Sequence, residues 1–131
     1  MERFKEVIVT TTISPSMIWK DPVIIKEIDE KEFKELIEKR DFKSAVGHEV
    51  TAKILSKKFN IDIKFNRENI AITYNTLILA AIPQFRVSES REFTEDEIKS
   101  AEFRYFIAYT IDIDEINRIA EASSDPYNLY G

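Results

Sequence analysis

A continuous apolar run near the middle of the chain constrains the fold more than any other feature. Residues 77–82 read Leu-Ile-Leu-Ala-Ala-Ile, with no polar residue among them. A run that is apolar on both faces is typical of a strand in the centre of a sheet. It is followed by the polar segment 84–91, and loops that leave strands often carry functional residues. The run therefore predicts a central strand with a candidate site near its end.

Further strands and helices are predicted around this run. β-Branched and apolar residues predict strands at residues 6–12, 21–28, 70–74 and 104–113, the third of them paired as a hairpin with 76–83. Capping residues and apolar spacing predict helices at residues 29–39, 49–58 and 94–102. This order predicts an α/β fold: a compact single domain with a mixed β-sheet of about five strands and helices packed on it. We assign residues 1–113 to this domain and 114–131 to a C-terminal extension with a short helix and a loose tail.

The composition limits the classes of function. The 131 residues are 44% hydrophobic and 33% charged, which fits a folded globule rather than a disordered chain. The chain has no cysteine and one histidine, so we expect no disulfide, no metal and no other cofactor. The net charge of −5, without a basic stripe, argues against binding to extended nucleic acid. Neither a membrane-spanning stretch nor a signal peptide is evident, so we expect an intracellular protein without a membrane partner.

The single histidine, His48, lies in the most informative stretch of the chain, residues 44–58. Gly47 precedes it, and the apolar residues that follow recur at three- and four-residue spacings, which predicts an amphipathic helix beginning near His48. Helix N-termini attract anions through unpaired N–H groups and the helix dipole. His48 is therefore a candidate for proton transfer at a bound phosphate. A capping or surface histidine is the alternative, and spacing does not decide between the two.

Two loops and one arginine supply further candidates. Residues 10–16 form a hydroxyl-rich loop that either holds a phosphate or serves as a cap or turn. Arg86 and Glu89 lie in the polar loop after the central strand, where they belong either to a site or to an exposed ion pair. Arg67 is either a ligand contact or a surface residue. Each residue leaves both interpretations open when it is taken alone.

The order of these pieces resembles the viral ring nucleases, small proteins of archaeal viruses and some phages that inhibit type III CRISPR defence. The resemblance rests on Ser44-Ala-Val-Gly-His-Glu-Val-Thr-Ala52, on Phe65-Asn-Arg67, and on Arg86 with Glu89 three positions later. It spans residues 7–110. This chain departs from the family in the threonine-rich loop 10–14, where asparagine is common, and at Ser90, where glycine is usual.

The resemblance implies a homodimer in the host cytoplasm that binds cyclic tetra-adenylate at the dimer interface. It implies cleavage without a metal into linear di-adenylate that ends in a 2′,3′-cyclic phosphate. The implied catalytic residues are His48, Arg86 and Glu89. The implied ligand-binding residues are Thr11, Ser14, Gly47, Thr51, Arg67 and Arg86. Two alternatives remain: a non-catalytic sponge for the ring, and a viral protein-interaction or DNA-binding regulator in which the region of Gly47 and His48 is packed over.

Overall fold

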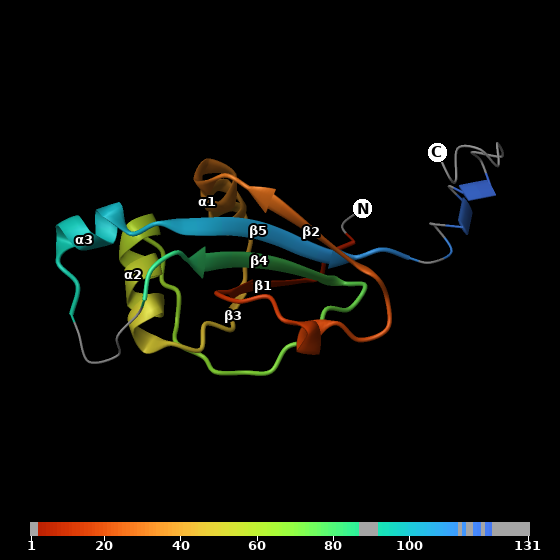
Figure 1. Ribbon diagram of the computed structural model, residues 1–131, viewed down its shortest axis with the longest axis horizontal. Helices are drawn as coiled ribbons and strands as arrows, with labels where there is room; N and C mark the ends of the chain where they lie inside the picture. Colours follow the sequence, from red (N-terminus) through yellow and green to blue (C-terminus); the bar gives the residue numbers. More distant parts are fainter. Residues whose placement is uncertain (1–2, 87–91, 113, 115–116, 119, 122–131) are drawn as a thin grey trace.

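The computed structural model describes residues 3–86, 92–112, 114, 117, 118, 120 and 121 (Figure 1). The strands are β1 (Glu6–Thr10), β2 (Val23–Ile28), β3 (Lys43–Ser44), β4 (Thr76–Pro83) and β5 (Phe103–Thr110). The helices are α1 (Glu30–Lys39), α2 (Glu49–Phe59), α3 (Glu95–Ser100) and the short 3₁₀ helix η1 (Pro15–Met17). The predicted α/β class with a mixed five-stranded sheet and helices is confirmed.

The strands form one sheet in the order β2-β5-β4-β1-β3. β1 pairs in parallel with both β3 and β4, whereas β5 pairs antiparallel with β4 and with β2. The apolar run predicted as a central strand is β4, in which residues 76–81 are all buried. Because β1, β3 and β4 are parallel, their carboxyl ends lie at the same edge of the sheet. Binding sites of α/β folds are usually found at such an edge.

α1, α2 and α3 pack on one face of the sheet. Phe33 of α1 and Leu55 of α2 are both fully buried, and they share a core with Leu79 of β4. The ring of Phe33 also lies 4.8 Å from that of Tyr105 on β5, measured between centroids. Burying a side chain of this size stabilises a fold by about 1.5–3 kcal/mol. This core fixes the position of α2 and therefore of its N-terminus, where the candidate site lies.

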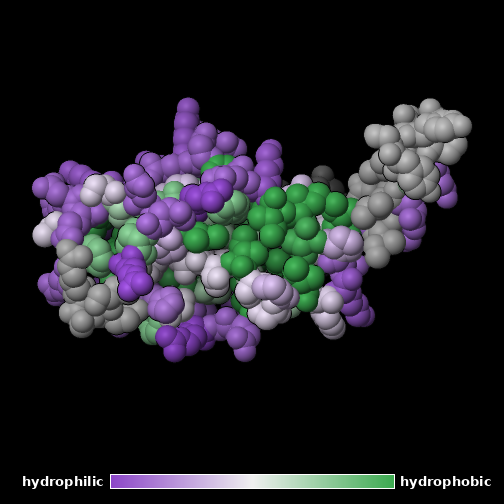
Figure 2. Space-filling model, viewed as in Figure 1, coloured by the Kyte–Doolittle hydropathy of each residue, from purple (hydrophilic) through white to green (hydrophobic). Residues whose placement is uncertain are grey.

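The other face of the sheet is only partly covered. Ile8, Ile78, Ala108 and Ile25 follow one another across β1, β4, β5 and β2, so their side chains lie on the same face. The first three belong to a buried cluster with Met17 of η1, whereas Ile25 on the edge strand is 49% exposed. Figure 2 shows the resulting apolar area over β4 and β5. We call this side of the sheet the open face.

Two features of the sheet differ from the sequence predictions. The predicted hairpin of residues 70–74 with 76–83 is wrong, because Ile72 makes only an isolated parallel bridge to Ile18. Both sides of β4 are taken by β1 and β5, which leaves no place for a hairpin partner. The sequence analysis also missed β3, since two residues are too few to show a period.

Two elements in the C-terminal part of the chain also end earlier than predicted. α3 ends at Ser100 rather than at residue 102, and β5 ends at Thr110 rather than at 113. Residues 114, 117, 118, 120 and 121 are helical, within the range predicted as a short helix. The predicted loose tail falls mainly on residues 122–131, outside the described residues, and the division at residue 113 stays a prediction. No helix in the described part of the chain is long and apolar enough to cross a membrane.

Candidate functional site

α2 begins where the sequence predicts it. His48 is the N-cap residue, with an extended backbone (φ −130°), and the Ala52 N–H donates to the His48 carbonyl oxygen at 3.0 Å. The imidazole itself makes no capping hydrogen bond, and the side chain is exposed. The side chain of His48 therefore does not serve as a cap. It lies beside the positive end of an 11-residue helix.

Two loops meet beside His48 because β1 and β3 are parallel neighbours. They end side by side, so residues 11–14 and 45–48 leave the sheet at the same edge. The Ala45 N–H donates to the Val9 carbonyl oxygen at 2.8 Å, and the Thr10 hydroxyl donates to the Ala45 carbonyl oxygen at 3.4 Å. These bonds hold the hydroxyl-rich loop against the segment that starts α2.

A pocket of about 740 Å³ lies between these loops, and we call it the His48 pocket. This volume falls in the range of about 300–1,000 Å³ that is usual for small-ligand sites. The pocket brings together His48, predicted as catalytic, and five residues predicted to bind the ligand: Thr11, Ser14, Gly47, Thr51 and Arg67. The predicted residues of the hydroxyl-rich loop thus face a cavity, and Thr51 forms a buried part of its wall with 1% exposure.

Arg67 lies directly against the loop that carries His48. Its Nη2 and Nε donate to the Gly47 carbonyl oxygen at 3.1 Å and 3.4 Å. A Cβ added at Gly47 would lie 3.8 Å from Arg67 Cγ, so the arginine stem covers the glycine at ordinary contact distance. Among the described residues Arg67 pairs with no carboxylate. Its positive charge is therefore available to an anion in the pocket.

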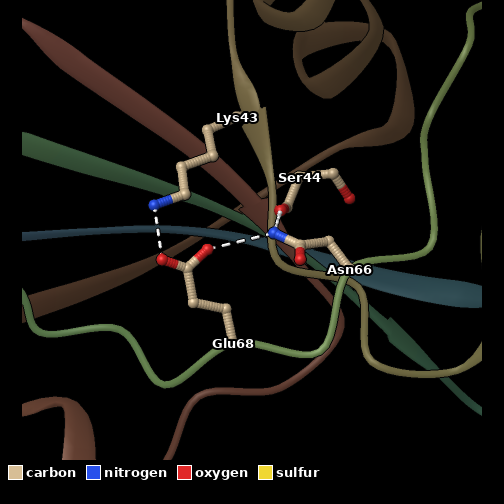
Figure 3. Close-up of polar contacts among 4 residues, drawn as sticks. All are labelled: Lys43, Ser44, Asn66 and Glu68. Carbon is tan, nitrogen blue, oxygen red and sulfur yellow. Dashed lines mark hydrogen bonds and ion pairs between the residues drawn. The ribbon is translucent and has the colours of Figure 1, made fainter.

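A polar cluster holds the segment that carries Arg67 (Figure 3). Asn66 Nδ2 donates to the Ser44 carbonyl oxygen of β3 at 2.7 Å and to Glu68 Oε2 at 3.0 Å. Lys43 Nζ donates to the other carboxylate oxygen of Glu68 at 2.7 Å. The residues on both sides of Arg67 are thus joined to β3, which fixes the position of the Arg67 backbone.

The ion pair in this cluster shifts the pKa of both partners. The hydrogen bond from Lys43, together with a second one from Asn66, lowers the pKa of Glu68. The same bond to Glu68 raises the pKa of Lys43, so both groups are charged at neutral pH. Sequence reasoning did not select Lys43 or Glu68. The one signal in the sequence is their place next to the motifs 44–52 and 65–67.

Arg86 does not line the His48 pocket. It is exposed and lines a smaller pocket near α3, which we call the Arg86 hollow. Phe85 packs edge-on against Phe103, with ring centroids 5.4 Å apart, and so fixes the direction in which the chain leaves β4. Glu89 lies outside the described residues. The active-site roles of Arg86 and Glu89 therefore stay predictions.

The His48 pocket offers one imidazole, one guanidinium and several hydroxyl groups. Charged N–H donors of this kind, above all a planar guanidinium, suit phosphate oxygens. No three His, Asp or Glu side chains in the described part of the chain lie close enough to hold a metal ion.

Comparison with known proteins assigns the chain to a family. The sequence pattern of the STIV B116-like family matches residues 7–119. The chain belongs to the STIV B116-like family. It is 37% identical to "Uncharacterized protein 26" of Sulfolobus islandicus filamentous virus (isolate Iceland/Hveragerdi) over 91 residues, 70% of this chain and 73% of that protein. It is accordingly an archaeal viral protein of this family.

A solved structure shares the fold of this STIV B116-like chain. B116 of Sulfolobus turreted icosahedral virus superposes with a TM-score of 0.68 and 19% sequence identity. The match covers 79% of this chain and 98% of that one. The likeness supports the order of strands and helices described above.

Proposed function

We propose that this chain is a metal-independent ring nuclease. In this proposal it binds cyclic tetra-adenylate at a dimer interface and cleaves it to linear di-adenylate with a 2′,3′-cyclic phosphate, which inhibits type III CRISPR immunity. The observation that carries the proposal is the His48 pocket. One cavity joins the histidine at the start of α2, an arginine without a carboxylate partner among the described residues, and a hydroxyl-rich loop.

The reaction needs few groups from the protein. The ribose 2′-oxygen forms a bond to the adjacent phosphorus while the bond from phosphorus to the 5′-oxygen breaks. The 2′-hydroxyl proton passes to solvent, and the leaving 5′-oxygen takes a proton from the imidazolium of His48. Arg67 and the N–H groups at the start of α2 stabilise the charge on the phosphate. Holding the ring in line for this attack supplies much of the remaining acceleration.

A homodimer would place two such pockets on one ring. Cyclic tetra-adenylate has two-fold symmetry, and so does a dimer formed through the same surface on both subunits. The open face is the surface that we assign to this contact, because it leaves apolar side chains such as Ile25 exposed. Met17, Ala45 and Ile70 belong both to the apolar cluster on this face and to the lining of the His48 pocket. Packing two open faces together therefore brings the two pockets close.

A sponge that binds the ring without cutting it is the second candidate. The separation of Arg86 from the His48 pocket favours this alternative, because the described part of one chain gives the phosphate one arginine. The regulator interpretation expected the region of Gly47 and His48 to be packed over, whereas His48 is exposed and lines a cavity. The nuclease and the sponge both require the pocket to bind the ring.

Isothermal titration of the chain with cyclic tetra-adenylate tests this requirement. We expect one ring per two chains and binding that survives in His48→Ala, because the imidazole acts on the leaving oxygen. Lys53→Ala, an exposed change one turn further along α2, is the matched control. No binding of the ring by the native chain would contradict both the nuclease and the sponge.

A further inference from the structure

We infer that Lys43, which does not line the His48 pocket, keeps this pocket receptive to anions by holding the carboxylate of Glu68. The inference rests on the proposed function, since it concerns how the same pocket accepts phosphate groups. Lys43 acts through Glu68 and is therefore a positioning residue.

The charges around the pocket explain why Glu68 needs a compensating cation. Of the described residues that line the pocket, Arg67 is the only lysine or arginine and Glu68 is the only aspartate or glutamate. A carboxylate in this position repels phosphate oxygens and attracts the neighbouring guanidinium. Lys43 adds a second positive charge next to Glu68. The charge of Arg67 then remains uncompensated and available to the ligand.

The geometry of Glu68 fits this role. Lys43 donates to Oε1 at 2.7 Å, and Asn66 donates to Oε2 at 3.0 Å, so each carboxylate oxygen has its own donor. Figure 3 shows the two donors reaching the carboxylate from different sides. Among the described residues no hydrogen bond or ion pair joins Glu68 to Arg67, whose guanidinium donates to Gly47 instead.

A purely structural ion pair makes a different prediction. Lys43→Ala and Glu68→Gln both break the same pair, so a structural role predicts that both substitutions weaken ligand binding. If Lys43 acts by compensating the charge of Glu68, the two substitutions have different effects. Removing the lysine exposes the pocket to the carboxylate, whereas removing the carboxylate's charge makes the lysine unnecessary. The double variant Lys43→Ala/Glu68→Gln should then bind as the native chain does.

The experiment measures binding of inorganic pyrophosphate and of cyclic tetra-adenylate to these variants by calorimetry at low ionic strength. We expect Lys43→Ala to weaken binding of both about three- to tenfold, Glu68→Gln to leave it unchanged or tighter, and the double variant to return to within about twofold of native. These differences shrink at high salt, because the charges are screened. Arg67→Ala measures how much affinity is lost when the cation that lines the pocket is removed. Circular dichroism verifies the fold of each variant.

A second ion pair supplies the matched control. Lys34 Nζ lies 3.8 Å from Glu38 Oε1 on α1, away from the open face, and neither residue lines the His48 pocket. Lys34→Ala removes this exposed pair, and we expect it to leave both affinities unchanged.

The outcomes separate this inference from the proposed function. The inference is overturned if Lys43→Ala and Glu68→Gln weaken binding equally, or if the double variant does not recover. In either case, ring binding by the native chain leaves the proposed function in place. The expected order with pyrophosphate, without binding of the ring, supports the inference and contradicts the proposed ligand. If the native chain binds neither compound, both are overturned.

Discussion

The His48 pocket and the Arg86 hollow each contain an arginine that the sequence motifs assign to one active site. Arg67 lies against Gly47, on a segment joined to β3 by Asn66 and Glu68. Arg86 lies in the smaller hollow, beyond the end of β4. The order of motifs along a chain thus does not show whether the residues lie in one cavity. The five predictions that follow examine the two cavities and the surfaces around them.

The largest effect is expected from His48→Ala. Losing a general acid lowers a rate by about 10²- to 10⁴-fold. We expect a loss of this size in single-turnover cleavage of cyclic tetra-adenylate, with ring affinity retained. Lys53→Ala, exposed on the same helix, is expected to cut at the native rate. A His48→Ala variant that cuts at the native rate would move the chemistry away from this pocket.

Arg67→Ala should weaken ring binding by about 10- to 100-fold, the usual loss for a charge-assisted hydrogen bond. The affected quantity is the dissociation constant, because Arg67 lies in the pocket before any reaction takes place. Titration with labelled ring at fixed salt measures it. Unchanged affinity would show that the phosphate groups lie elsewhere, with the Arg86 hollow as the next place to test.

Ile25→Glu tests whether the open face joins two His48 pockets. Burying a carboxylate in an apolar contact is costly, so we expect the dimer dissociation constant to rise about tenfold or more. Sedimentation equilibrium measures this constant, and cleavage should fall in parallel. Lys26→Glu places the same charge at the neighbouring exposed position, on the opposite face of β2, and should leave the dimer intact. A native chain that is a monomer would contradict this assignment of the open face.

Arg86→Ala gives the most direct comparison of the two cavities. If the Arg86 hollow meets the bound ring during reaction, the cleavage rate falls about five- to tenfold while affinity stays within about threefold, because the contact forms in the transition state. Kinetics at saturating and at limiting ring separate the two effects. Native rates in this variant would restrict the active site to the His48 pocket.

The smallest effect concerns the pH dependence of stability. The pKa of Glu68 in the folded chain lies below the ordinary 4.5, so this group stabilises the fold at higher pH. Its contribution is lost as the pH falls through the lowered pKa, because the unfolded chain then binds the proton more readily. Thermal unfolding between neutral pH and about pH 3 should therefore show a shallower acid-side decline in Glu68→Gln. An identical decline in both proteins would exclude a folded-state role for this charge.

The sequence predicts much of the fold and part of the site. Strong local patterns identify β4 and the start of α2, because an apolar run and a helical period need few residues to be seen. The hairpin prediction failed because the tertiary fold determines which strands pair with β4. Both edges of β4 pair with strands that are distant in sequence, β1 and β5. β3 has two residues and no pattern, although it positions Lys43 and Ser44 beside the pocket.

In the candidate site too, the sequence predicts the local features and misses the contacts between distant residues. Gly47 and His48 were predicted from a motif and a helix start, which are local features. Lys43 and Glu68 were missed because their pairing joins residues 25 apart in the chain and has no periodic signal. The position of Arg86 relative to His48 depends on how Phe85 packs against Phe103, which sequence order does not reveal.

The most direct test is incubation of the native chain with labelled cyclic tetra-adenylate and an excess of chelator, followed by mass spectrometry of the products. We predict linear di-adenylate that ends in a 2′,3′-cyclic phosphate, formed without a metal ion by attack of the ribose 2′-hydroxyl. A ring that stays bound and intact would leave a sponge in place of a nuclease. A ring that is neither bound nor cut would contradict the assignment of this pocket.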